Sequence, residues 1–275
     1  MKKRLVGKVC VVTGATRGIG RGIAIALAEE GAIIYVTGRS TGEGALTVES
    51  CVKAIEDNGG KGIGVVTDHA NDSEIESLFN KIFEEQEKID LLVNNVFKIP
   101  DNPVWSGGFW EHPIQAWDDQ VGIGLRAHYV ASWHAAPLLF KSDESLIMNI
   151  SSPGGSSYHF SSSYGTGKAG LDRLTADMAV ELKEKGVHTI SLYPGAVSTE
   201  FVLDNAAKTG NKVENAQTPL MVGRTVVALA LAEDLTERSG SIQWVEDISR
   251  EFDVRDENGN LAAPYPIRNN IKTAD

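Results

Sequence analysis

The 275-residue sequence has little cysteine and no excess of basic residues, and each shortage excludes a class of protein. Its two cysteines, Cys10 and Cys51, are too few for a disulfide framework in a chain of this length. Its 37 acidic and 26 basic residues give a formal net charge of -11. Because nucleic-acid binding needs a basic face, we expect no nucleic-acid partner.

Metal-binding patterns and long apolar runs are also missing. The six histidines are scattered without metal-ligand spacing, so no metal site is expected. No apolar run reaches about 18 residues, which predicts no membrane-spanning segment. The basic start, M-K-K-R-L-V-G-K, is not followed by the apolar stretch of a signal peptide. These features predict a soluble, cytoplasmic protein.

Short apolar runs alternate with amphipathic segments of helical length along most of the chain. The runs are almost continuously hydrophobic, as in a parallel sheet covered on both faces. This alternation predicts a Rossmann-type, doubly wound α/β fold in a single domain spanning 1–275, with its core over about 7–245. A C-terminal extension over about 246–275 is expected to contain a hairpin turn at Asn258-Gly259. Strands are predicted near 9–13, 32–37, 62–68, 90–95, 145–151, 187–193 and 241–245, and helices near 21–30, 46–58, 73–86, 117–139, 164–185 and 219–232.

The first motif, T-G-A-T-R-G-I-G, lies between a predicted strand and a predicted helix. Gly14 permits a tight turn, Gly18 lets the backbone approach a phosphate, and Gly20 lets the helix pack closely on the strand. The helix N-terminus then offers N–H groups and partial positive charge to a pyrophosphate. A glycine triad alone is weak evidence, but its place between strand and helix predicts a dinucleotide site.

The end of the second predicted strand, T-G-R-S, bears on the choice of dinucleotide. NAD-selective sites usually carry an acidic residue here for the ribose 2′-hydroxyl. This sequence has Arg39 instead, and Arg17 lies in the glycine loop. Two guanidinium groups suit a 2′-phosphate, which favours NADP(H) over NAD(H). The alternative is that both are solvated surface arginines.

Four further motifs follow in order: T-D at Thr67-Asp68, V-N-N ending at Asn95, S-S followed by Y-G-T-G-K, and P-G-A-V-S-T starting at Pro194. With the glycine loop, they make the chain resemble the short-chain dehydrogenase/reductase family from about residue 7 to 240. The stretches W-D-D, S-S-P-G and R-D-E-N-G are similar to its dehydrogenase/reductase member 1 subgroup.

The resemblance implies an oxidoreductase that uses NAD(P)(H) on a carbonyl or alcohol substrate. It also implies a homodimer or homotetramer, formed through the helices near 117–139 and 164–185. Asp68 resembles the residue that hydrogen-bonds adenine. The cofactor-binding positions implied are Gly14, Thr16, Arg17, Gly18, Ile19, Gly20, Arg39, Asp68, Asn95, Tyr164, Lys168, Pro194, Gly195, Val197 and Thr199.

Tyr164 and Lys168 are four residues apart and would share one face of a helix. A free phenol titrates near 10, and a nearby ammonium would lower that pKa and ease proton transfer. Tyr164 is therefore predicted to protonate the developing alkoxide. The resemblance implies that Lys168 also holds the nicotinamide ribose. A serine at the preceding strand end would hydrogen-bond the carbonyl oxygen; the motif favours Ser152, although the more frequent family spacing points to Ser151.

Two positions depart from the family pattern. Val96-Phe97 replace its usual Ala-Gly, and Gly124 stands where it usually has asparagine. In the family, the main-chain carbonyl of that asparagine helps to hold a water that links the lysine to solvent. Glycine keeps the carbonyl, so we expect the relay to survive and Gly124→Asn to be tolerated. The alternative is a catalytically weak or silent dinucleotide-binding sensor or scaffold.

An aromatic loop at 101–113 bears on the substrate. Trp105, Phe109 and Trp110 either line an apolar cleft or pack as a lid or subunit contact. The polar segment 201–219 matches the family's mobile substrate lid. A bulky, apolar carbonyl compound is the expected substrate.

Overall fold

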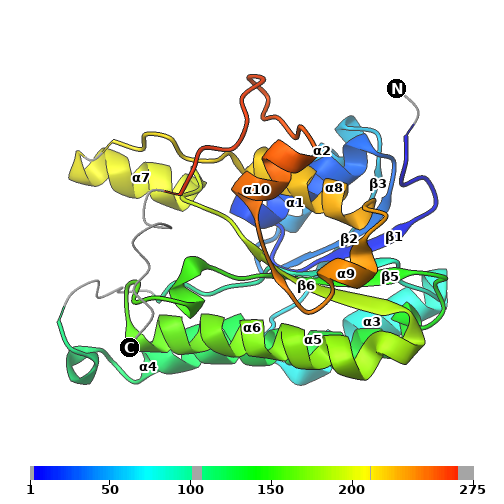
Figure 1. Ribbon diagram of the computed structural model, residues 1–275, viewed down its shortest axis with the longest axis horizontal. Helices are drawn as coiled ribbons and strands as arrows, with labels where there is room; N and C mark the ends of the chain where they lie inside the picture. The colour runs from blue at the N-terminus through cyan, green and yellow to red at the C-terminus, as the bar shows by residue number, and fades with distance from the viewer. Residues whose placement is uncertain (1–2, 101–106, 211, 266–275) are drawn as a thin grey trace.

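The computed structural model describes residues 3–100, 107–210 and 212–265 and is built on a seven-stranded parallel sheet (Figure 1). The strand order is β3-β2-β1-β4-β5-β6-β7. The chain thus reverses direction across the sheet between β1 and β4, where doubly wound folds bind ligands. The strands are β1 (Val9–Val12), β2 (Ile33–Gly38), β3 (Lys61–Val66), β4 (Leu91–Asn94), β5 (Ser145–Ile150), β6 (Val187–Tyr193) and β7 (Ile242–Trp244).

Helices cover both faces of the sheet, as expected for these strands (Figure 1). The helices are α1 (Gly18–Glu29), α2 (Val48–Asp57), α3 (Asp72–Gln86), α4 (Gln115–Trp117), α5 (Ala127–Leu139), α6 (Ser162–Leu182), α7 (Glu200–Thr209), α8 (Pro219–Ala230), α9 (Leu235–Arg238) and α10 (Val245–Glu251). Val12 packs in a core with α1 and α8, whereas its neighbour Val11 packs in a second core with α3 and α5. Successive side chains of a strand point to opposite faces, so each buried strand serves both cores. The predicted doubly wound fold is confirmed.

The helix predicted over 117–139 is not continuous. A π-helical stretch, Asp118–Arg126, separates α4 from α5. It contains Gly122 and Gly124, and glycine has a low helix propensity. Such π-helical turns often occur at functional sites.

Three helices toward the C-terminus were not expected: α7, the short α9 and α10. α7 begins after Thr199, whose hydroxyl accepts a hydrogen bond from the Val202 amide at 3.4 Å, within the segment expected to be only a polar lid. α10 follows β7 directly. The predicted turn at Asn258-Gly259 is present: Arg255 pairs with Leu261 in an antiparallel bridge, and Gly259 has φ +82°. Within the described residues, no helix combines the length and apolar character needed to cross a membrane.

Candidate active site

The predicted site residues gather at the carboxyl ends of β1, β4, β5 and β6. Gly14 follows β1, Asn95 follows β4, Ser152 follows β5, and Pro194 and Gly195 follow β6. Because the strands are parallel and adjacent, segments far apart in sequence meet at this edge.

The glycine loop is held in a conformation that excludes side chains. Gly14 has φ +66°, and a Cβ there would lie 2.8 Å from the Cα of Val96. A Cβ on Gly20 would lie 2.4 Å from the Asn95 side-chain nitrogen. That nitrogen donates to the carbonyl oxygens of Thr13 and Gly14, at 2.9 and 3.0 Å. Asn95 therefore fastens β4 to the loop.

The N-terminus of α1 already binds an anionic group of the chain itself. The amide of Gly18 donates to Oε2 of Glu200 at 2.9 Å, and a Cβ on Gly18 would lie 3.3 Å from the Thr199 side chain. A helix N-terminus favours negative charge, and here a carboxylate takes the position suited to a phosphate. Sequence reasoning missed Glu200, because only the packing of α7 brings it to this amide.

The candidate adenosine end lies beside β2 and β3. Arg39 forms an ion pair with Asp68 at 3.7 Å, and Arg17 donates to the Ser40 hydroxyl at 3.4 Å. Thr16 is buried against Gly38. Arg17 and Arg39 are both exposed, and the partner of Arg17, Ser40, lies next to Arg39 in sequence at the end of β2.

The loop after β6 closes the other side. Gly195 donates its amide to the Gln217 side chain at 3.1 Å, and Val197 pairs with Gln217 in a parallel bridge. Ile19, in the first turn of α1, packs against the core. With the glycine loop and the anion-binding amide of Gly18, these features fit a bound dinucleotide.

Ser161 begins α6 and places the predicted catalytic pair in its first turns. Its hydroxyl accepts a hydrogen bond from the Tyr164 amide at 3.2 Å, a good N-cap. Lys168 follows one turn later and is only 6% exposed. Its ammonium donates to the carbonyl oxygen of Ile150 at 2.9 Å. Burial lowers the pKa of Lys168 to about 8, while nearby Asp172 acts in the opposite direction.

Tyr164 is enclosed by aromatic rings and by backbone. The rings of Phe97 and Phe160 meet it edge-on, with centroids at 5.8 and 5.2 Å. A Cβ on Gly154 would lie 2.5 Å from a Tyr164 ring carbon. Burial raises the pKa of Tyr164 to about 12, although a hydrogen bond with Ser152 lowers it. The predicted lowering by Lys168 is therefore not seen in the chain alone, where burial is the larger effect.

The two serines after β5 have different partners. Ser152 lowers the pKa of Tyr164 and accepts from the Gly154 amide at 3.1 Å. Ser151 is buried against α6, where its hydroxyl donates to the Lys168 carbonyl oxygen at 3.4 Å. The two serines that the motif spacing left open thus differ in partner: Ser152 acts on Tyr164, and Ser151 contacts the backbone at Lys168.

Gly124 contacts Phe97, which alters the expectation for asparagine at this position. A Cβ on Gly124 would lie 3.0 Å from two carbons of the Phe97 ring. This is shorter than the usual contact distance between two carbon atoms, which is about 3.5–4.0 Å. An asparagine at position 124 therefore requires the Phe97 ring to shift, and the tolerance of Gly124→Asn stays a prediction that depends on this shift.

Tyr265 brings the C-terminal extension to the same edge. Its hydroxyl hydrogen-bonds Nε2 of His159 at 2.8 Å, and its ring lies 5.9 Å from that of Trp244. Its amide donates to the buried Glu246 of α10. The sequence indicated a C-terminal extension, but nothing in it indicated that the extension contacts the segment before α6.

The aromatic loop is only partly described, since Trp105 lies outside the described residues. Phe109 and Trp110 contact each other edge-on at 5.3 Å and are 69% and 75% exposed. Neither is buried against the described part of this chain, so both predicted roles stay open.

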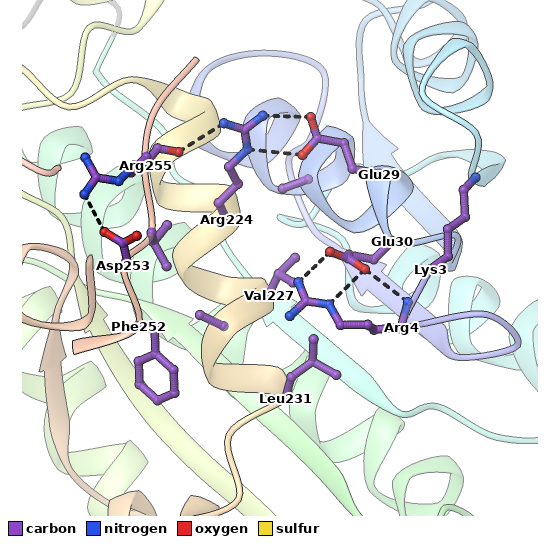
Figure 2. A pocket seen from close by; sticks show the side chains of 13 residues that line it. Lys3, Arg4, Glu29, Glu30, Arg224, Val227, Leu231, Phe252, Asp253 and Arg255 are labelled. Atoms are coloured by element: carbon purple, nitrogen blue, oxygen red, sulfur yellow. Dashed lines mark hydrogen bonds and ion pairs between the residues drawn. The ribbon is translucent and has the colours of Figure 1, made fainter. Parts of the chain in front are cut away.

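A surface hollow elsewhere has a different character. It lies between the N-terminal segment, α1, α8 and the tail (Figure 2). There Arg224 pairs with Glu29 at 3.0 Å and Arg4 donates to Glu30. In 3–100, 107–210 and 212–265, no cluster of three or more histidine, cysteine or acidic residues suits a metal ion.

A glycine-lined, anion-binding helix start next to a tyrosine–lysine pair with a buried ammonium defines a dinucleotide-dependent oxidoreductase. A family model described as short chain dehydrogenase matches residues 8–210. The chain belongs to the short-chain dehydrogenase/reductase family, whose members bind an NAD(P) dinucleotide, and the predicted resemblance is confirmed.

Two relatives and one solved structure describe this membership further. The human dehydrogenase/reductase SDR family member 1 is 38% identical over 273 residues, covering 94% of this chain and 86% of that protein. A 3-oxoacyl-acyl-carrier-protein reductase of Aquifex aeolicus is 32% identical over 202 residues, covering 73% and 78%. The fold matches a short chain dehydrogenase structure from Mycobacterium thermoresistibile with a TM-score of 0.81, at 24% identity and 95% and 92% coverage.

Proposed function

We propose that the protein reduces a carbonyl compound to an alcohol with NADPH, and that Tyr164 donates the proton. The observation that carries this proposal is the half-buried Tyr164, whose pKa Ser152 lowers, with the buried Lys168 one turn away on α6. All three side chains lie at the carboxyl edge of the sheet, next to the glycine loop.

When bound, the cofactor supplies a hydride to the carbonyl carbon. Ser152 holds the carbonyl oxygen by a hydrogen bond, as an oxyanion-type contact. Tyr164 gives its proton to that oxygen as negative charge develops. Its raised pKa keeps it protonated at neutral pH, the form that reduction requires. Lys168, charged below pH about 8, stabilises the phenolate that remains.

Binding of the dinucleotide is assigned to the loop and to the edge residues around it. The Gly18 amide and the α1 N-terminus bind the pyrophosphate. Arg39 and Arg17 bind the 2′-phosphate of NADP(H). The absence of an acidic residue at the end of β2 supports this preference over NAD(H).

The substrate is proposed to be an apolar carbonyl compound. Phe97 and Phe160 surround the Tyr164 ring, and the Trp244–Tyr265 pair lies beside the loop that follows β6. Ligand sites are usually lined by apolar and aromatic side chains with few polar groups. A panel that compares long-chain and aromatic ketones with small polar ones tests this assignment.

A homodimer or homotetramer is proposed through α5 and α6. Tyr129 and Trp133 on α5 are 52% and 64% exposed, which is unusual for large aromatic side chains on one helix. Sedimentation at micromolar concentration should show a dimer or tetramer. A monomer would contradict the assembly and leave the chemistry unaffected.

Tyr164→Phe tests the reaction itself. We expect turnover of a carbonyl panel to fall by about two to four orders of magnitude, with NADPH affinity nearly unchanged. Near wild-type turnover in this variant would refute the proposed function. Ser152→Ala should lower turnover by roughly tenfold to a thousandfold, because it removes the oxyanion contact. Ser151→Ala is the matched control and should change turnover less.

A further inference from the structure

Phe97, directly after β4, contacts both members of the proposed catalytic pair. Its ring meets that of Tyr164 at 5.8 Å with an interplanar angle of 89°. The Lys168 ammonium lies 5.1 Å from the centre of the same ring. An ammonium within about 6 Å of an aromatic face is attracted to it, most strongly where water is excluded. Phe97 therefore offers its face to one group and lies edge-on to the other.

The backbone that carries Phe97 is held firmly. The Val96 amide donates to the Thr13 hydroxyl at 3.1 Å, and His128 Nε2 lies 2.8 Å from the Val96 carbonyl oxygen. Burial lowers the pKa of His128 to about 3, so the neutral ring donates this hydrogen bond. The ring of Phe97 thus extends from a fixed point beside the glycine loop.

Space for the ring depends on Gly124. A Cβ there would lie 3.0 Å from carbons Cδ2 and Cε2 of Phe97. The π-helical stretch that contains Gly124 is fixed to the start of α6, because the Ser161 hydroxyl donates to the Gln120 side chain at 3.1 Å. A larger residue at 124 would have to displace the ring.

Positions 97 and 124 share one contact, so bulk at one position limits the bulk that the other can hold.

We propose that Phe97 is a positioning residue of the reaction: its face holds the Lys168 ammonium, its edge fixes the Tyr164 ring, and Gly124 is small to admit it. This proposal rests on the proposed function. The buried ammonium has a carbonyl oxygen on one side and the ring on another. Tyr164, Asp172 and His128 are the titratable groups around it.

Phe97→Leu tests the role of the aromatic face, since leucine keeps apolar bulk without it. We expect turnover to fall about tenfold and the alkaline limb of the pH profile to move down by about one unit, because the charged lysine loses a stabilising partner. Phe97→Tyr keeps the face and should restore the profile. Phe79→Leu, in the core and on α3, is the matched control and should lower stability without moving the profile.

The steric half of the proposal is tested without cofactor or substrate, by thermal unfolding of Gly124→Asn, Phe97→Gly and the double variant. Gly124→Asn should be destabilising alone and much less so beside Phe97→Gly, because the double variant frees the space. Additive effects, or a Phe97→Leu profile that matches wild type, would overturn the proposal. If Tyr164→Phe keeps its turnover, the proposed function fails instead, whatever the unfolding cycle shows.

Discussion

The carboxyl edge of the sheet and the hollow beside α1 and α8 both contain charged side chains, but in opposite settings. In the hollow, Arg224 and Glu29 are about one-third exposed and pair at 3.0 Å (Figure 2). The hydrogen bonds that Arg224 donates to Glu29 raise the pKa of the guanidinium, which stays charged. At the edge, Lys168 is buried against a carbonyl oxygen and a ring, and burial lowers its pKa to about 8.

The difference separates charges that stabilise the fold from charges that serve chemistry. A partly exposed ion pair contributes little free energy and no reactivity. A buried ammonium without a carboxylate in contact is unfavourable for folding. Because no carboxylate neutralises it, its positive charge can instead stabilise a phenolate or a bound cofactor. The direction of the shift therefore distinguishes the two regions: ion pairing raises the pKa of Arg224 in the hollow, whereas burial lowers the pKa of Lys168 at the edge.

Lys168→Met should give the largest effect, because it removes the group that most distinguishes the edge. We expect turnover to fall at least about a hundredfold and cofactor affinity to fall with it. The free energy of unfolding of Lys168→Met, in contrast, should exceed that of wild type below pH 8. The folded chain holds the Lys168 pKa near 8, below its ordinary 10.5, so the folded form binds fewer protons across that window.

Wild-type stability should therefore rise relative to Lys168→Met as pH increases through the window. The gain is on the order of 3 kcal/mol between pH 8 and 10.5. Below pH 8 the full penalty for the buried charge remains, and the variant should be the more stable protein. Denaturant unfolding at several pH values measures the difference, and a gap that does not change with pH would contradict the assignment.

Arg39→Asp should have the next largest effect. It exchanges a cation for an anion at the end of β2, and we expect NADPH affinity to fall about ten- to a hundredfold while NADH affinity rises. Fluorescence titration with both dinucleotides measures this change. Arg255→Asp, which makes the same charge change at the hollow, is the control. An equal loss of NADPH affinity in both variants would mean that net charge, and not the position of Arg39, causes the effect.

Glu200→Gln should tighten dinucleotide binding by about three- to tenfold. The Glu200 carboxylate accepts from the Gly18 amide and so competes with a phosphate at the α1 N-terminus. Asp204→Asn removes the same charge from the same helix, α7, where Asp204 pairs with exposed Lys208. It should leave affinity within about twofold of wild type. An equal increase in dinucleotide affinity for both variants would point to general repulsion between the acidic protein and the dinucleotide.

Glu29→Gln should give the smallest effect on function. Breaking its pair with Arg224 should lower the free energy of unfolding by about 1 kcal/mol or less and leave turnover unchanged. Thermal unfolding and the carbonyl assay measure both quantities. A clear loss of turnover would mean that the hollow and the edge are coupled, and the comparison between them would fail.

Particular residues show how far sequence reasoning reached into the site. Asn95 was expected near the cofactor, and the structure finds it fastening β4 to the glycine loop. The alternatives Ser151 and Ser152 could not be separated by spacing, because adjacent residues at a strand end point to opposite sides. Glu200 and Tyr265 gave no local signal, since each reaches the edge through a segment distant in sequence.

The sequence by itself determined the doubly wound sheet, the position of the glycine loop and the spacing of Tyr164 and Lys168. These follow from hydrophobic periodicity, from the steric needs of a tight turn and from helical pitch, all of which act over a few neighbouring residues. Only the tertiary structure decided which way the Tyr164 pKa moves and that Phe97 and Gly124 share one volume. Both depend on burial and on contacts between segments that are brought together only when the parallel strands align.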